Sequence, residues 1–225
     1  MQEVPQSKTK GKRNLIWPQD YINKIINMDC LDAMKGIPDK SVDLVLTDPP
    51  YGVGLKYNGY NDTPENLIKL IPQFMPELLR VGKRVVLTPG NSNQYLYPKP
   101  TWTMAWIIRQ GTGMNLWGFT CWQPILVYGK DPYLANMMGA RPDIIEGKNV
   151  ISKKYNHPCP KPIDIWSKIL LRCSVKKTDL ILDPFLGSGT TAVACKELGR
   201  KFIGIEISEK YCEIAERRLA QEYLF

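Results

Sequence analysis

The segment from Asp179 to Glu206 reads DLILDPFLGSGTTAVACKELGRKFIGIE. Its apolar runs and glycine-rich turn predict a strand over 179–182, a tight turn, a helix over 190–198 and a strand over 201–205. Flanking patterns add helices over 163–174 and from Ser208 onward. Strands that alternate with helices in this way form parallel sheets with covering helices, so the sequence predicts an α/β fold.

Earlier in the chain, further strands and one long helix are predicted. The predicted strands lie within 20–28 and over 41–47, 84–87 and 125–128. The helix runs from Thr63 to Arg80, and Pro72 and Pro76 should kink or split it. Segment 100–119 is ambiguous, and 129–162 loses periodicity into Gly, Pro, Asn and Lys, which indicates a loop or a small lobe.

Length and charge describe one domain with a basic excess. The chain has 225 residues, 44% hydrophobic and 23% charged, with a formal net charge of +8. This composition excludes a wholly disordered or collagen-like protein. Residues 1–14 are basic and poor in apolar side chains, which predicts a flexible arm before a domain over 15–225. A net positive charge favours a polyanionic partner such as nucleic acid, although solubility alone also accounts for it.

Metal and membrane functions find no support in the sequence. The six cysteines form no C-x-x-C pair and the chain has a single histidine, so we expect no metal site. No apolar run approaches the roughly 20 residues of a membrane-spanning helix, and no hydrophobic signal core stands at the start. We therefore expect reduced thiols and a cytoplasmic location.

The turn from Asp183 to Gly189 has the features of a nucleotide-like binding site. It joins a strand to a helix whose first amides are free, and its glycines allow a ligand close to the backbone. Glu206 ends the next strand, where a doubly wound fold offers a carboxylate to ribose hydroxyls. A phosphate-binding P-loop fits poorly, because no lysine precedes the threonines at 190 and 191.

A second motif, Asp48-Pro49-Pro50-Tyr51, follows another predicted strand. It offers a carboxylate, a proline carbonyl and an aromatic face, which together suit a flat base that carries an amino group. The lone pair of such an amino group is delocalised into the ring, so two acceptors on its hydrogens would free the pair for attack. Tyr51 stacked on an extruded base would contribute about 1–3 kcal/mol.

With these two motifs, the chain resembles the β group of S-adenosylmethionine-dependent DNA amino-methyltransferases, which modify adenine N6 or cytosine N4. The likeness covers about 25–219, and the order in which position 48 precedes position 185 is typical of this group. The resemblance implies a mostly parallel seven-stranded Rossmann-like sheet with a circularly permuted order of motifs along the chain. It also implies S-adenosylmethionine as cofactor and direct methyl transfer to a base flipped out of DNA.

The resemblance assigns two sets of site residues. The catalytic set is Asp48, Pro49, Pro50 and Tyr51. The cofactor-binding set is Asp29, Cys30, Asp48, His157, Lys161, Asp183, Pro184, Phe185, Gly187, Ser188, Gly189, Thr190 and Glu206. In this assignment Asp29 and Cys30 lie near the cofactor's adenine, Glu206 holds its ribose, and the glycine turn surrounds its methionine half.

One family element departs from its usual form. The segment His157-Pro158-Cys159-Pro160-Lys161-Pro162 replaces the family's His-Pro-Thr-Gln-Lys-Pro at two positions, Cys159 and Pro160. The hydroxyl and amide that relatives supply there are absent. The pair Pro158-Cys159 is also similar to the Pro-Cys pair of cytosine ring-carbon methyltransferases. That second likeness would leave the Asp48 motif without a function, so we reject it.

The resemblance favours adenine, since the family's cytosine members more often carry serine where this chain has Asp48. The alternatives are cytosine N4, an RNA base, a protein side-chain amide, or a catalytically silent DNA-binding relative. The expected partner is double-stranded DNA, with restriction-modification as the setting. Segment 129–160 is the expected target-recognition insertion. It is short for this task, so either specificity is low, or a second copy of the chain or another partner adds contacts. Tyr57, Asn58 and Tyr60 are placed to cover a flipped nucleotide.

Overall fold

The computed structural model describes residues 15–57, 60–111, 113–115, 117–147 and 161–221. The predicted basic arm over 1–14 therefore lies outside the described residues, and so do residues 148–160.

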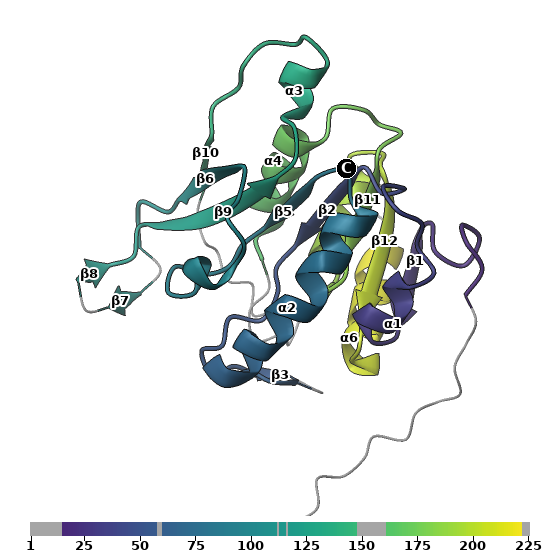
Figure 1. Cartoon of the computed structure of the whole chain (residues 1–225), viewed down its shortest axis with the longest axis horizontal. Helices are drawn as coiled ribbons and strands as arrows, with labels where there is room; N and C mark the ends of the chain where they lie inside the picture. Colours follow the sequence, from purple (N-terminus) through teal and green to yellow (C-terminus); the bar gives the residue numbers. More distant parts are fainter. Residues whose placement is uncertain (1–14, 58–59, 112, 116, 148–160, 222–225) are drawn as a thin grey trace, which may run out of the picture.

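A central eight-stranded sheet, in the order β1-β12-β11-β2-β5-β9-β6-β10, organises the molecule (Figure 1). Its strands are β1 (Lys24–Asn27), β2 (Leu44–Thr47), β5 (Val85–Leu87), β6 (Trp102–Ile107), β9 (Trp122–Tyr128), β10 (Ile144–Glu146), β11 (Leu180–Asp183) and β12 (Lys201–Glu206). All neighbouring pairs are parallel except those that β9 makes with β5 and β6. Strands β1, β12, β11, β2 and β5 therefore end at one edge of the sheet.

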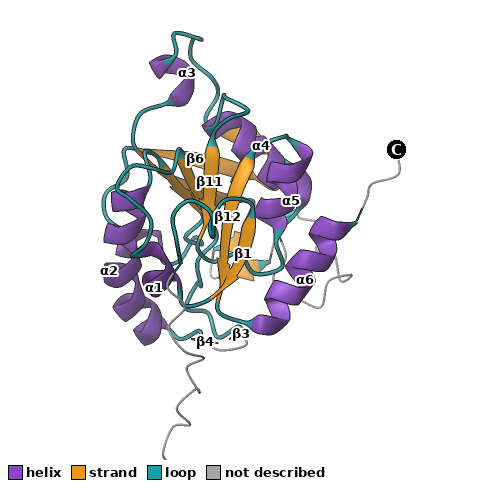
Figure 2. Cartoon of the chain, turned by 90° about the vertical axis from the view of Figure 1, so that its right-hand side faces the viewer, coloured by secondary structure: helices purple, strands orange, loops and turns teal. Residues whose placement is uncertain are grey.

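Helices cover both faces of this sheet. Figure 2 shows α1 and α2 on one side and α4, α5 and α6 on the other. Their bounds are α1 (Cys30–Met34), α2 (Pro64–Val81), α4 (Ile163–Cys173), α5 (Thr190–Glu197) and α6 (Glu209–Ala220). The remaining elements are the hairpins β3 (Lys56–Tyr57) with β4 (Tyr60–Asn61) and β7 (Met114–Asn115) with β8 (Gly118–Phe119), and the short helices η1 (Gln94–Leu96) and α3 (Pro132–Ala135).

Two hydrophobic cores follow from this three-layer arrangement. One joins the sheet to α1 and α2 through side chains such as Met34, Leu67 and Phe74. The other joins it to α4, α5 and α6 through side chains that include Trp166 and Ala215. Strands β2, β5 and β11 lie between the cores and are buried along their whole length, which explains their continuous apolar runs.

The long helix α2 is continuous, so the expected split at its prolines is wrong. Thr63 caps its start by accepting a hydrogen bond from the Asn66 amide at 3.2 Å, and Pro64 occupies the first turn. Pro72 and Pro76 are one turn apart and both exposed. Carbonyls that lack a partner on that face reach water, while the opposite apolar face stays packed on the sheet.

The sheet has one strand more than the seven that the resemblance implied. The extra strand, β10, pairs in parallel with β6 and is the last strand on that side of the sheet. It falls inside the expected insertion 129–160, of which 144–146 thus pair with the sheet, and 148–160 lie outside the described residues. The α/β class, the mostly parallel sheet and its flanking helices are confirmed.

None of the described helices is long and apolar enough to cross a bilayer. Within the same residues, no group of three or more histidine, cysteine or acidic side chains could hold a metal ion.

Candidate active site

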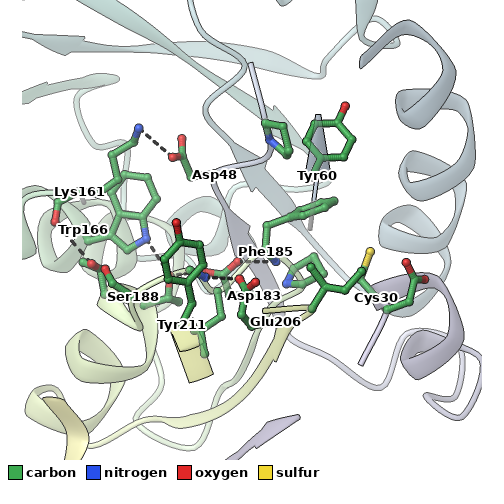
Figure 3. Close-up of a pocket in the computed structure, with 18 of the residues that line it drawn as sticks. Cys30, Asp48, Tyr60, Lys161, Trp166, Asp183, Phe185, Ser188, Glu206 and Tyr211 are labelled. Carbon is green, nitrogen blue, oxygen red and sulfur yellow. Dashed lines mark hydrogen bonds and ion pairs between the residues drawn. The ribbon is translucent and has the colours of Figure 1, made fainter. Parts of the chain in front are cut away.

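The two motifs are brought together because the strands that precede them are neighbours. Strands β2 and β11 pair in parallel, with Leu44 opposite Ile181, so Asp48 and the turn after Asp183 emerge from the same edge. Strands β12 and β1 continue the sheet and place Glu206 and Asp29 at that edge as well. A cleft lies there (Figure 3), containing about 1030 Å³ of space not filled by atoms, its open mouth included.

The cleft is lined by residues from both expected sets. Those expected are Asp29, Cys30, Asp48, Pro50, Lys161, Asp183, Pro184, Phe185, Gly187, Ser188, Thr190 and Glu206, and Tyr60 lines it too. Pro49, Tyr51 and Gly189 belong to the same two motifs but do not line it. His157 and Asn58 lie outside the described residues. Sequence reasoning missed Leu70, Trp166, Leu186, Thr191, Ile207 and Tyr211.

Asp183 holds the glycine turn together from inside the protein. Its side chain is buried, and Oδ1 accepts hydrogen bonds from the Thr47 hydroxyl at 2.7 Å and the Phe185 amide at 3.1 Å. Its Oδ2 accepts from the Thr191 hydroxyl, which in turn accepts from Trp166 Nε1 at 2.8 Å. The carboxylate thereby ties β2, β11 and α5 into one unit beneath the cleft.

Burial raises the pKa of the Asp183 carboxyl from 3.8 to about 6, against the lowering effect of its hydrogen bonds. Because the folded state holds this proton more tightly, the carboxyl's contribution to stability is greatest below pH 3.8 and is lost as the pH rises through 6. Asp183→Asn has the same shape but does not titrate. The free energy of unfolding of wild type minus that of Asp183→Asn should therefore fall between pH 4 and pH 7, by at most about 3 kcal/mol. Urea unfolding of both proteins across this range measures it, and a difference that grows with pH would contradict the assignment.

The glycine turn is shaped by its backbone conformation and by Glu206. Gly187 adopts φ +54°, and its amide donates to Glu206 Oε2 at 2.8 Å, while the Ser208 amide donates to Oε1 at 2.8 Å. Gly189 adopts φ +86°, and a Cβ there would lie 2.6 Å from the Ala215 Cβ. Both positions therefore require glycine, the second because α6 passes so close. Burial raises the pKa of Glu206 above its usual value.

Arg218 of α6 supports the same turn from behind and was not singled out by the sequence. Its guanidinium is buried and donates through Nη1 to the Ser188 carbonyl at 2.7 Å, to Ser188 Oγ at 3.0 Å and to Thr190 Oγ1 at 3.1 Å. A charged residue in an amphipathic helix gives no sign that it points inward.

On the other side of the cleft, Asp29 and Cys30 start helix α1. Asp29 caps the helix by accepting from the amides of Leu31 at 2.8 Å and Asp32 at 3.3 Å. Burial raises the pKa of the Cys30 thiol to about 12, so this sulfur stays protonated and acts as a small apolar wall.

The catalytic motif forms a compact hydrogen-bonded group around the Asp48 carboxylate. Oδ1 accepts from the hydroxyls of Tyr51 and of Thr88, which follows β5. Oδ2 forms an ion pair with Lys161 Nζ at 2.7 Å (Figure 3). The same ammonium donates to the Tyr51 hydroxyl at 2.8 Å. Burial raises the pKa of Tyr51 above its ordinary value, so its hydroxyl remains a donor. The arrangement presents an acceptor at the cleft opposite the glycine turn.

The fold is that of S-adenosylmethionine-dependent methyltransferases, as two solved structures show. A solved structure of the M1.HpyAVI–SAM complex covers 88% of this chain and 99% of its own, with a TM-score of 0.60 at 24% identity. The cytosine-N4-specific PvuII DNA methyltransferase superposes with a TM-score of 0.66 over 90% of this chain and 88% of its own, at 15% identity.

Sequence comparison finds DNA methyltransferases among the similar proteins. A family model described as DNA methylase matches residues 114–217. The type II methyltransferase M.HpaI of Haemophilus parainfluenzae is 29% identical over 238 residues, which cover 89% of this chain and 75% of the relative. The DNA adenine methyltransferase YhdJ of Escherichia coli is 27% identical, covering 87% of this chain and 82% of the relative. These matches agree with the resemblance that the motifs indicated, to DNA methylases that act on adenine N6 or cytosine N4.

Proposed function

We propose that this protein transfers the methyl group of S-adenosylmethionine to the exocyclic amino group of adenine in double-stranded DNA. One observation carries the proposal: the Asp48 motif and the Asp183–Gly189 turn, more than 130 residues apart, line a single cleft. A cleft of this kind can hold a methyl donor on one side and an aminated base on the other, which is what direct transfer between two bound reactants needs.

The residues of the cleft fit the cofactor. Four carboxylates line it, from Asp29, Asp48, Asp183 and Glu206, a set that suits a ligand with cationic sulfonium and ammonium groups. Glu206 is the acceptor for the ribose hydroxyls, and Asp29 is the acceptor for the adenine amino group. The glycine turn faces the methionine half. When bound, the cofactor supplies the electrophilic methyl carbon.

The chain's own residues supply the acceptors for the target. In this proposal Asp48 and the Pro49 carbonyl accept hydrogen bonds from the two hydrogens of the base's amino group. These bonds draw the lone pair of the amino nitrogen out of conjugation with the ring. A carboxylate is a weak base, so Asp48 aligns the nucleophile, and the proton is lost late, to Asp48 or to water. Tyr60, which lines the cleft, is the aromatic side chain assigned to contact the extruded base.

Two features favour adenine in DNA. The Asp48 position carries a carboxylate rather than the serine that is more frequent among cytosine-specific members, and a relative named as a DNA adenine methyltransferase aligns over most of the chain. The net charge of +8 suits the phosphate backbone of a duplex. With 129–160 as a short recognition segment, a second copy of the chain would supply further contacts.

The proposal is tested by incubating the purified protein with labelled S-adenosylmethionine and unmethylated genomic DNA, followed by mass spectrometry of the nucleosides. We expect label in N6-methyladenine. Label in N4-methylcytosine would correct the base while keeping the reaction. Parallel incubations with RNA and with a protein extract serve as controls, and label in either of them with none in DNA would overturn the proposal.

A further inference from the structure

The contacts of Lys161 suggest a role that differs from cofactor binding. The residue precedes helix α4 and lies 113 positions after Asp48. Its ammonium nevertheless reaches the two polar side chains of the catalytic motif, Asp48 at 2.7 Å and Tyr51 at 2.8 Å. The lysine side chain is 7% exposed and that of Asp48 is 19% exposed. An ion pair screened from water in this way is stronger than one on the surface.

The donors around Asp48 are unevenly distributed over its two oxygens. An ionised carboxylate has about four acceptor positions, two on each oxygen. Oδ1 takes the hydroxyls of Tyr51 and Thr88, neither of which lines the cleft. Oδ2 takes the ammonium of Lys161, a residue that lines the cleft. Among the described contacts one acceptor position is left, on Oδ2, and Asp48 itself lines the cleft.

We infer that Lys161 is a positioning residue, which fixes the Asp48 carboxylate so that one lone pair of Oδ2 is presented to the amino group of the target base. The inference rests on the proposed function and adds a specific part to it. Without the ammonium, only the hydroxyls of Tyr51 and Thr88 on Oδ1 would hold the carboxylate. Oδ2 would then be less restrained about χ2, which lowers the fraction of molecules with the acceptor in place.

Lys161 also links the two halves of the site. Its backbone carbonyl lies 3.5 Å from the hydroxyl of Thr190, at the start of α5, while its side chain holds the catalytic motif. One residue thus contacts the element on which the methyl donor is placed and the group that aligns its acceptor. Its ammonium is already engaged by Asp48 and Tyr51, whereas the cofactor-binding role that the resemblance implied requires it to face the cofactor.

The two roles make different predictions for Lys161→Met, which keeps the length of the side chain but removes its charge. If Lys161 positions Asp48, the affinity for S-adenosylmethionine, measured by calorimetry, should stay within about threefold of wild type. The single-turnover rate at saturating cofactor and DNA should fall at least about tenfold. Lys161→Arg, which keeps a cation, should recover part of that rate. Lys168→Met removes an exposed lysine of the same helix, which donates to the Glu146 carbonyl at 2.9 Å, and should match wild type in both measurements.

A double-mutant cycle with Asp48→Asn completes the experiment. Because Lys161 acts through the carboxylate, Lys161→Met should slow the Asp48→Asn protein by less than about threefold. The same four proteins are unfolded in urea without cofactor or DNA, and their stabilities should also be non-additive. This second cycle reports the ion pair whether or not the protein methylates DNA, so failure of the inference is separable from failure of the proposed function.

Two results would overturn the inference. One is a cofactor affinity at least about tenfold weaker in Lys161→Met with an unchanged saturated rate, which would make Lys161 a cofactor ligand. The other is an equal loss of rate from Lys161→Met in the wild-type and Asp48→Asn backgrounds, because a residue that acts through Asp48 cannot retain its full effect when that carboxylate is gone.

Discussion

Asp48→Ala should lower the rate of methyl transfer by at least about two orders of magnitude, the usual effect of removing one transition-state hydrogen-bonding group. The substitution removes the acceptor that aligns the target's amino group, and it leaves the glycine turn on the opposite side of the cleft untouched. We therefore expect S-adenosylmethionine to bind within about fivefold of wild type. Single-turnover transfer of labelled methyl to DNA, together with calorimetric titration of the cofactor, measures both quantities.

Asp48→Asn is the control for structural damage, because Asp48→Ala leaves the ammonium of Lys161 without its carboxylate partner. Asparagine keeps the shape and one carbonyl acceptor, so its rate should lie between those of wild type and Asp48→Ala. Both variants should unfold in a single cooperative transition. Turnover near the wild-type level in Asp48→Ala would refute the role assigned to this carboxylate.

The sequence allowed the main features of this site to be predicted because parallel strands bring distant residues to a common edge. Asp48 and Asp183 each follow a short buried apolar run, and such runs in an α/β chain end at the carboxyl edge of the sheet. The pairing of β2 with β11, which the sequence did not predict, brings the two ends side by side. Residues of both motifs line one cleft, as the sequence led us to expect.

The residues that could not be predicted act through side chains rather than through motifs. Thr88, Arg218 and Trp166 are single residues in ordinary-looking segments, and their importance depends on where a rotamer points. Lys161 was assigned from a motif, but its ion pair with Asp48 depends on the position of α4 against β2, which no local pattern contains. The exposure of Pro72 and Pro76 was likewise set by packing of α2 on the sheet.

Gly187→Val should weaken binding of S-adenosylmethionine by at least about tenfold, a loss of about 1.4 kcal/mol or more. Gly187 lines the cleft and adopts φ +54°, a left-handed conformation that a β-branched residue resists. A valine would either fill space beside the backbone or force the turn to change, which would pull its amide away from Glu206. Calorimetric titration of the cofactor without DNA measures the effect apart from catalysis.

Backbone strain alone needs a matched control, and Gly199→Val provides it. Gly199 has a similar φ of +67°, a Cβ there meets no atom within 4 Å, and the residue lies between α5 and β12, at the edge of the sheet opposite the cleft. This variant should lose stability by an amount comparable to that of Gly187→Val, yet bind cofactor as wild type does. Equal affinity of Gly187→Val and wild type would show that the cofactor occupies another site, because no ligand held against this turn could accommodate the added side chain without loss.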